Sequence, residues 1–224
     1  MKLLLLAIAP IFIIIFYIYL MDKYDKEPKR LLLASFLLGA VGSIIITLVI
    51  YLGFDMILPL KDKFSVPQQF IKAFIVVALT EEFSKYIIVR FFAQPKQAFD
   101  EPYDGIMYAV MVSMGFAATE NVIYVLEGGY VTGFLRAFTA VPAHATFGIL
   151  MGYFMGKAKF SKNRIQLNLM GLLLAVIFHG FYDFFLFIDF IPGIWIGAFV
   201  SLILGIILSR KAIKIHQENS HFKN

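Results

Sequence analysis

Long apolar segments separated by short charged loops run through almost the whole chain. Taking roughly 20 apolar residues as the length that crosses about 30 Å of hydrocarbon, we expect membrane-spanning helices near 3–21, 31–53, 69–92, 104–126, 133–156, 167–188 and 192–209. The first segment exceeds the roughly 7–15 residues of a signal-peptide core and no small-x-small cleavage site follows it, so we interpret it as a retained anchor. The pattern predicts an all-α, polytopic membrane helix bundle of about seven helices.

The composition is typical of an integral membrane protein. Hydrophobic residues make up 60% of the chain, charged residues 16%, and the mean hydropathy is +0.82, which excludes a water-soluble fold. With no cysteine there is no disulfide, thiolate nucleophile or thiolate metal site. The loops leave no room for a soluble domain. We therefore predict one integral membrane domain over 1–224, with the chemically important core at about 69–188 and a basic tail at 210–224.

The distribution of cations predicts the orientation. Cytoplasmic loops of membrane proteins carry an excess of Lys and Arg, and with seven spans almost all loop cations fall on one side, whereas the other receives only Lys2, Lys61 and Lys63. We expect the N-terminus outside and the C-terminal tail in the cytoplasm. The net charge of +5 follows from this topology, so we expect a lipid bilayer and no nucleic acid as partner.

Charged and imidazole side chains inside the apolar segments are the candidates for chemistry. They are Glu81, Glu82, Lys85, Glu120, His144, His179 and Asp183. A charge at membrane depth costs at least ~2.5–3.5 kcal/mol, so such residues normally face the bundle interior and serve a reaction or a transport path. At 1.5 Å per residue, the depths of four of them fall from mid-membrane outward under the predicted orientation: Glu81, Glu120, His144 and His179. The sequence therefore predicts one site in the outer half of the bilayer.

Helical spacing places the two histidines on packing faces. Gly171, Ala175, His179 and Asp183 recur every fourth residue, and His144 is followed by glycines at the same interval. Glu81 and Lys85 lie one turn apart and can pair. Purely structural alternatives exist: a Glu–Lys pair that locks helices together, or a His144 that bonds a carbonyl freed by Pro142. Asp104, after Pro102, is the expected N-cap of its helix.

This set of side chains suits peptide hydrolysis. The reaction needs an activated water, a proton donor for the leaving amine and stabilisation of an oxyanion. Burial disfavours an ionised carboxyl and Lys85 favours it, so Glu81 and Glu82 can differ in protonation, and one of them would act as the base. Glutamates and histidines could instead hold Zn²⁺, although the His-Glu-x-x-His signature is absent. Spacing leaves both mechanisms open, along with a transporter that uses the same groups as a proton or cation relay.

Four ordered motifs resemble the signatures of PrsW-type intramembrane proteases. They are Glu81-Glu82-Phe-Ser-Lys85, Gly115-Phe116-Ala-Ala-Thr-Glu120-Asn121, Pro142-Ala-His144-Ala and His179-Gly-Phe-Tyr-Asp183. That family is similar to the type II CAAX prenyl endopeptidases, from which this chain departs by Glu120 in place of His and Asp183 in place of Asn. Because an ionised Asp only accepts hydrogen bonds, mechanism and prenyl specificity do not transfer directly.

The resemblance implies site-1 cleavage of a single-pass, membrane-anchored anti-sigma factor, which leads to release of an extracytoplasmic-function sigma factor. It implies catalytic roles for Glu81, Glu82, Glu120 and His179, with His144 and Asp183 as further members. From the residues, we expect Lys85 to tune the glutamate pair, Glu120 to position it or bind a metal, and His179 with Asp183 to stabilise the oxyanion or donate the proton.

Overall fold

The structure is a computed structural model that describes residues 2–223, and its regular structure over this range is helical, without strands. The α-helices are α1 (Lys2–Met21), α2 (Lys29–Leu37), α3 (Ile44–Ile57), α4 (Val66–Ile71), α5 (Thr80–Ile88), α6 (Pro102–Phe138), α7 (Ala140–Lys159), α8 (Arg164–Phe187) and α9 (Ile196–Glu218). Three π-helical segments, η1 (Leu38–Ser43), η2 (Lys72–Leu79) and η3 (Val89–Ala93), make 29–57 and 66–93 two continuous rods.

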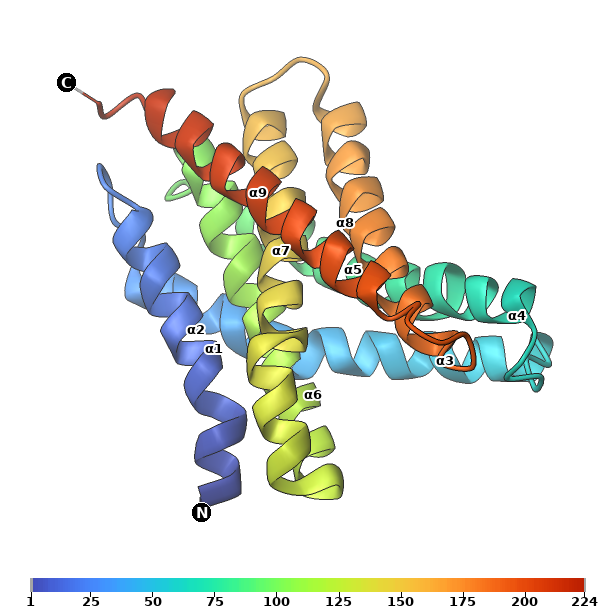
Figure 1. The fold of residues 1–224 in the computed structure, drawn as a ribbon. Helices are drawn as coiled ribbons and strands as arrows, with labels where there is room; N and C mark the ends of the chain where they lie inside the picture. Colours follow the sequence, from blue (N-terminus) through green and yellow to red (C-terminus); the bar gives the residue numbers. More distant parts are fainter. Residues whose placement is uncertain (1, 224) are drawn as a thin grey trace.

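These helices form the predicted membrane bundle. Within residues 2–223, five helices are long and apolar enough to cross a membrane, counting Lys29–Ile57 and Pro102–Lys159 as one helix each. That long helix is folded: its chain reverses at Gly129, where φ is +71°, and bends again at Thr139 before α7. Figure 1 shows α6 running to the end of the molecule where the N-terminus lies and returning into α7. The predicted all-α polytopic bundle is confirmed.

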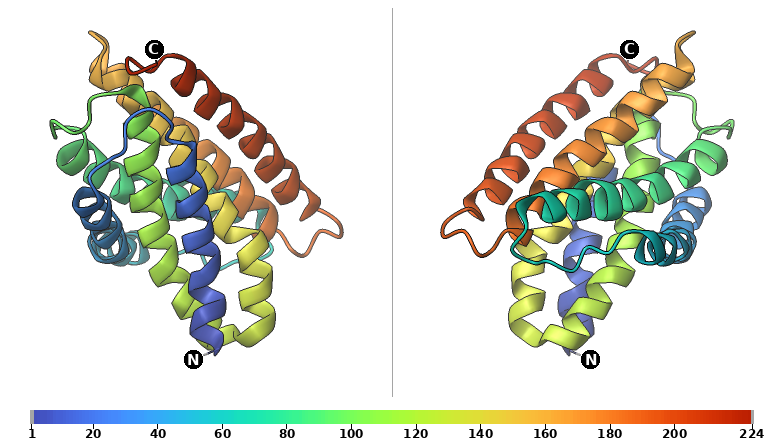
Figure 2. Two further views of the ribbon diagram at one scale, coloured as in Figure 1. Left: turned by 90° about the vertical axis from the view of Figure 1, so that its left-hand side faces the viewer. Right: turned by 90° about the vertical axis from the view of Figure 1, so that its right-hand side faces the viewer.

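Segments far apart in the sequence meet at the ends of the helices. At one end of the molecule, the Gln217 side chain near the end of α9 donates to the Met21 carbonyl, and the Lys159 ammonium donates to the Gln94 carbonyl. The C-terminus lies at this end in both views of Figure 2, and the N-terminus lies at the other. Phe64 lies in the loop before α4 and Phe190 in the loop before α9, and their rings pack together with centroids 5.5 Å apart. The predicted path of seven alternating spans and the orientation across the membrane stay predictions.

Small residues set the spacing of α6, α7 and α8. A Cβ added to Gly152 would lie 2.4 Å from the Gly105 carbonyl oxygen of α6, and one added to Gly156 would lie 2.0 Å from that of Pro102. On α8, a Cβ at Gly171 would lie 2.7 Å from the Met151 carbonyl oxygen of α7. The glycine rows are therefore packing faces, as predicted, and they bring the histidines that continue them toward neighbouring helices.

The start of α6 differs from the prediction. Glu101, not Asp104, is the N-cap; Asp104 is the third helical residue, and its carboxylate accepts the Glu101 backbone N–H at 2.7 Å in a reciprocal capping box. Pro102 occupies the first helical position, where its missing N–H costs nothing. Placing the cap at Asp104 was wrong because both carboxylates have suitable spacing and only the backbone angles separate them.

Buried acids lie in the loop between α1 and α2. Both carboxylate oxygens of Asp22 lack a hydrogen-bond partner within residues 2–223, and burial raises the pKa of Asp22 to about 7. Burial, and next the neighbouring Asp104 carboxylate, raise the pKa of Glu27 to about 10, and the Tyr108 hydroxyl donates to Glu27. The folded loop therefore binds protons that the unfolded chain releases at neutral pH.

The orientation can be tested because the chain has no cysteine. We expect a Lys63→Cys variant to react with a membrane-impermeant maleimide in intact cells. A Lys162→Cys variant should react only after permeabilisation, since its loop is predicted to be cytoplasmic. The opposite labelling pattern would invert the topology.

Stability should fall as pH rises. A carboxyl whose pKa is higher in the folded state loses its favourable proton as pH rises from the unfolded value toward the folded one. For Asp22 this window runs from 3.8 to about 7, and for Glu27 from 4.5 to about 10. Thermal unfolding in detergent between pH 5 and 8 should show a declining Tm, with a shallower slope in Asp22→Asn and Glu27→Gln. The exposed Asp55→Asn is the control, and equal slopes in all proteins would contradict the assignment.

Candidate functional site

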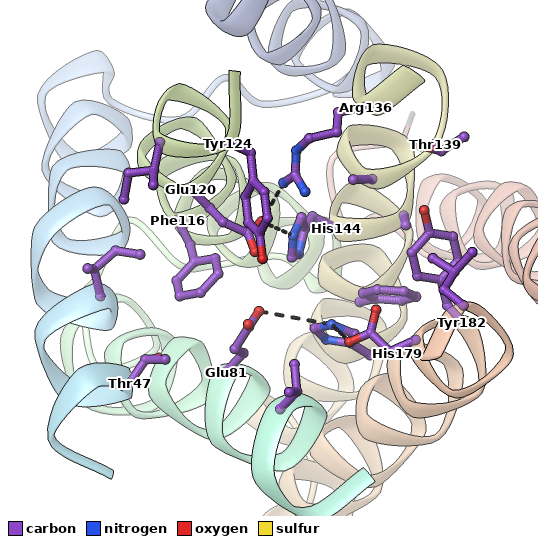
Figure 3. Close-up of a pocket in the computed structure, with 18 of the residues that line it drawn as sticks. Thr47, Glu81, Phe116, Glu120, Tyr124, Arg136, Thr139, His144, His179 and Tyr182 are labelled. Carbon is purple, nitrogen blue, oxygen red and sulfur yellow. Dashed lines mark hydrogen bonds and ion pairs between the residues drawn. The ribbon is translucent and has the colours of Figure 1, made fainter. Parts of the chain in front are cut away.

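A cavity of about 570 Å³ opens between the rods and the α6–α7–α8 core (Figure 3). Its lining includes Glu81, Glu120, His144, His179 and Asp183. The remaining predicted site residues, Glu82 and Lys85, lie behind this wall and are almost fully buried. The structure thus brings all seven residues into one cluster, although their catalytic roles stay a prediction.

Glu82 anchors the cluster from inside the bundle. It is 0% exposed, and its Oε1 lies 2.7 Å from the Lys85 ammonium and 2.9 Å from Nδ1 of His179. The predicted pair between Lys85 and Glu81 also forms, but at 3.7 Å it is the longer contact. The Lys85 ammonium lies 4.3 Å from the centre of the Phe116 ring as well. Lys85 therefore mainly neutralises Glu82.

His179 is held between carboxylates. Its Nδ1 faces Glu82, and its Nε2 lies 3.2 Å from Asp183 Oδ2 and 4.0 Å from Glu81 Oε2. The ring stacks on Phe147 with centroids 4.7 Å apart. Because both nitrogens face oxygens that accept hydrogen bonds when ionised, the imidazolium form satisfies both contacts. The geometry therefore suits a protonated His179 whose Nε2–H is near the cavity.

His144 has different partners and a different tautomer. Its Nδ1 lies 3.3 Å from the Lys85 ammonium, which can only donate, so Nδ1 accepts. Nε2 then carries the proton and donates to Glu120 Oε2 at 2.9 Å. The alternative that His144 bonds a carbonyl freed by Pro142 is wrong, since both ring nitrogens contact side chains.

Two residues join the site that the sequence did not single out as functional. Tyr51 of α3 donates its hydroxyl to Glu81 Oε1 at 2.9 Å. Arg136 contacts Glu120 Oε2 through Nη2 at 2.7 Å. Arg136 lies in an apolar segment but outside the four motifs, and Tyr51 lies in an apolar stretch without a motif. The presence of Arg136 in an apolar segment was the one available signal.

Glu81 has a free oxygen at the cavity wall. Its Oε1 is occupied by Tyr51, whereas the buried Oε2 has no hydrogen-bond partner within residues 2–223. A buried carboxylate oxygen without a partner carries a large desolvation cost. Oε2 of Glu81 is therefore an oxygen to which a water, a substrate group or a metal ion could bind.

Glu81, Glu120 and His144 could hold a metal ion. One ligand atom from each lies within 4.8 Å of the others. This donor set resembles the carboxylate and imidazole sets of catalytic zinc sites, which leave a position for water. If His144 bound through Nε2, its proton would move to Nδ1, which faces the Lys85 ammonium. Metal binding therefore fits the three ligands but requires Lys85 to shift or to give up a proton.

Sequence comparison identifies the family of the chain. A family model described as "PrsW family intramembrane metalloprotease" matches residues 27–209. The chain belongs to the PrsW family. "Protease PrsW" of Oceanobacillus iheyensis is 40% identical over 80% of each chain. That of Geobacillus kaustophilus is 37% identical over 87% of this chain and 84% of the relative, and that of Bacillus subtilis is 37% identical over 80% of each. No solved structure matches the chain significantly.

Membership of the PrsW family makes this protein a multi-pass intramembrane protease of the bacterial membrane. The matched region contains every candidate residue, from Glu81 to Asp183. The family assignment therefore favours the protease over the transporter that the sequence left open.

Proposed function

We propose that this protease makes the site-1 cut in a single-pass, membrane-anchored anti-sigma factor, near the outer face of the membrane, and so leads to release of an extracytoplasmic-function sigma factor. The main support for the site of cleavage is the free Oε2 of Glu81, buried in the wall of a cavity that also holds two histidines and two further acids. The resemblance of the four motifs supports the substrate class.

Glu81 is the base in this proposal, and Glu82 is not. Glu81 lines the cavity, whereas Glu82 is fully enclosed and its Oε1 is already shared by Lys85 and His179. A water bound at Glu81 Oε2 would lose a proton to that oxygen as it attacks the scissile carbonyl. Tyr51 holds the other oxygen of Glu81 and so fixes the direction of the free one.

His179 lies beside the Glu81 oxygen that would receive this proton. Its Nε2 lies 4.0 Å from Glu81 Oε2, so an oxyanion formed beside Glu81 can accept a hydrogen bond from Nε2–H. Glu82 and Asp183 hold the imidazolium in place from both sides. After the tetrahedral intermediate forms, the proton on Glu81 or on His179 passes to the leaving amine, and the peptide bond breaks.

Glu120 and His144 face Glu81 across the cavity and complete the site. Together with Glu81 they would hold a zinc ion, which lowers the pKa of bound water and polarises a carbonyl. Without such an ion, the same residues still exclude bulk water and orient the reacting groups through the Glu120–His144 hydrogen bond. In the form without an ion, Glu81 receives the proton from water; in the zinc form, Glu81 would instead be one of the three ligands.

Substrate cleavage tests the proposal directly. We expect co-expression with epitope-tagged single-pass anti-sigma factors to give a discrete fragment cut on the outer side of the span. Glu81→Gln should lower the rate by about 10²–10⁴-fold, because it removes the general base. Immunoblots of membrane fractions measure the fragment. Glu127→Gln, an exposed carboxylate outside the cavity, is the matched control. Full activity of Glu81→Gln, or a panel in which nothing is cut, would contradict the proposal.

Metal dependence is tested with purified protein in detergent. We expect a chelator to abolish cleavage and Zn²⁺ to restore it, and we expect elemental analysis to find bound zinc that His144→Ala loses. His221→Ala, an exposed histidine, is the control and should retain the metal. Full activity in protein shown to be free of metal would refute the zinc form of the site and leave Glu81 acting alone.

A further inference from the structure

Arg136 reaches the candidate site because α6 folds back on itself. The reversal at Gly129, with φ of +71°, is a backbone conformation that glycine adopts readily. It returns the segment 130–138 along the first limb of α6. Figure 3 shows the Arg136 side chain extending from this segment toward Glu120. The turn therefore joins residues that are sixteen positions apart in the sequence.

The Arg136 guanidinium donates hydrogen bonds to two consecutive residues of α6, both before the reversal at Gly129. Nη2 of Arg136 donates to Glu120 Oε2 at 2.7 Å, and Nε donates to Asn121 Oδ1 at 2.7 Å. The guanidinium also lies over the Tyr124 ring, 4.2 Å from its centre. These contacts use the planar fork of arginine, which the single ammonium of lysine cannot reproduce.

Asn121, the second of these acceptors, is itself held in place by a hydrogen bond. Nδ2 of Asn121 donates to the Ala7 carbonyl of α1 at 2.7 Å, and Asn121 is 0% exposed. This bond fixes the orientation of the Asn121 amide so that Oδ1 points to Arg136. The position of the guanidinium therefore depends on α1, which contributes no residue to the lining of the catalytic cavity.

We propose that Arg136 is a positioning residue that holds the Glu120 carboxylate against His144. Oε2 of Glu120 accepts from Arg136 at 2.7 Å and from His144 Nε2 at 2.9 Å, so the position of one donor constrains the other. Asn121 and Ala7 fix the arginine, and the arginine fixes Glu120. This inference rests on the proposed role of Glu120 in the proteolytic site.

Direct recognition of substrate by Arg136 is the competing role. The side chain lines the cavity and is 16% exposed, and only two of its five N–H groups are used by Glu120 and Asn121. The two roles differ in their kinetics. A residue that binds substrate in the ground state mainly changes KM, whereas a residue that positions a catalytic group changes kcat.

The test measures kcat and KM for cleavage of a tagged single-pass anti-sigma factor by the purified full-length protein in detergent. Loss of an outer partner of a catalytic group typically costs about 10- to 100-fold in activity. We expect both Arg136→Gln and Arg136→Lys to lower kcat by this amount with KM within about twofold. Arg90→Gln, which removes an intramembrane arginine with no carboxylate partner within residues 2–223, is the matched control.

A double-mutant cycle separates positioning from a general loss of structure. Asn121→Leu keeps Arg136 and Glu120 but removes the hydrogen bond between Asn121 and Arg136. We expect this variant to lower kcat several-fold. If the two residues act as one unit, Arg136→Gln/Asn121→Leu should be no slower than Arg136→Gln alone. Tm values measured in parallel identify variants that fail to fold. If neither Arg136 variant folds, the kcat of Asn121→Leu decides.

Four results would overturn the inference. They are a wild-type kcat for Arg136→Lys, a raised KM at unchanged kcat, strictly additive effects in the cycle, and a wild-type kcat for Asn121→Leu. Glu120→Gln, measured beside these variants, keeps the two proposals apart. If it retains full activity, or if no substrate is cut, the proposed site fails and this inference fails with it. If it is inactive while the Arg136 variants are active, only the inference fails.

Discussion

The buried ammonium of Lys85 is the charge on which the candidate site depends. It lies 2.7 Å from Glu82, 3.7 Å from Glu81 and 3.3 Å from His144 Nδ1, and it is 1% exposed. Two adjacent carboxylates at membrane depth would repel each other and carry a large desolvation cost. One cation between them offsets both costs. It also sets the tautomer of His144, because an ammonium can only donate.

Packing makes this charge cluster possible. The small-residue rows of α7 and α8 let the backbones approach closely, so the histidines that continue those rows reach α5 and α6. On the other side, Thr47 of α3 donates to Ser84 at 3.0 Å, and Ser84 donates to the Glu81 carbonyl at 2.8 Å. Close packing excludes lipid and bulk water, and low local dielectric strengthens each remaining electrostatic contact.

Much of this arrangement could be predicted from the sequence. Hydropathy gave the helical segments because spans have a minimum length, and the rarity of intramembrane charge identified all seven clustered residues. The finer geometry could not be predicted. Lys85 can pair with Glu81 or Glu82, since both spacings suit a helix, and only the rotation of α5 against α8 favours Glu82. Tyr51 contacts Glu81 from α3, a helix that carries none of the four motifs. Arg136 depends on the reversal at Gly129, which hydropathy does not specify.

The difference between Glu81 and Glu82 follows from the direction in which α5 presents each residue. Consecutive helical residues point about 100° apart, so one glutamate can face the cavity only if the other faces the bundle. The inward residue, Glu82, meets Lys85 and His179 and has no free path to substrate. The outward residue, Glu81, keeps one oxygen that has no hydrogen-bond partner among residues 2–223. The adjacent pair therefore supplies two carboxylates in different surroundings. Glu82 binds Lys85 and His179, and Glu81 lines the cavity, where it can accept a proton from water. A single glutamate could not do both, because the residue that meets Lys85 and His179 faces the bundle interior and is 0% exposed, whereas the residue that accepts the proton must line the cavity.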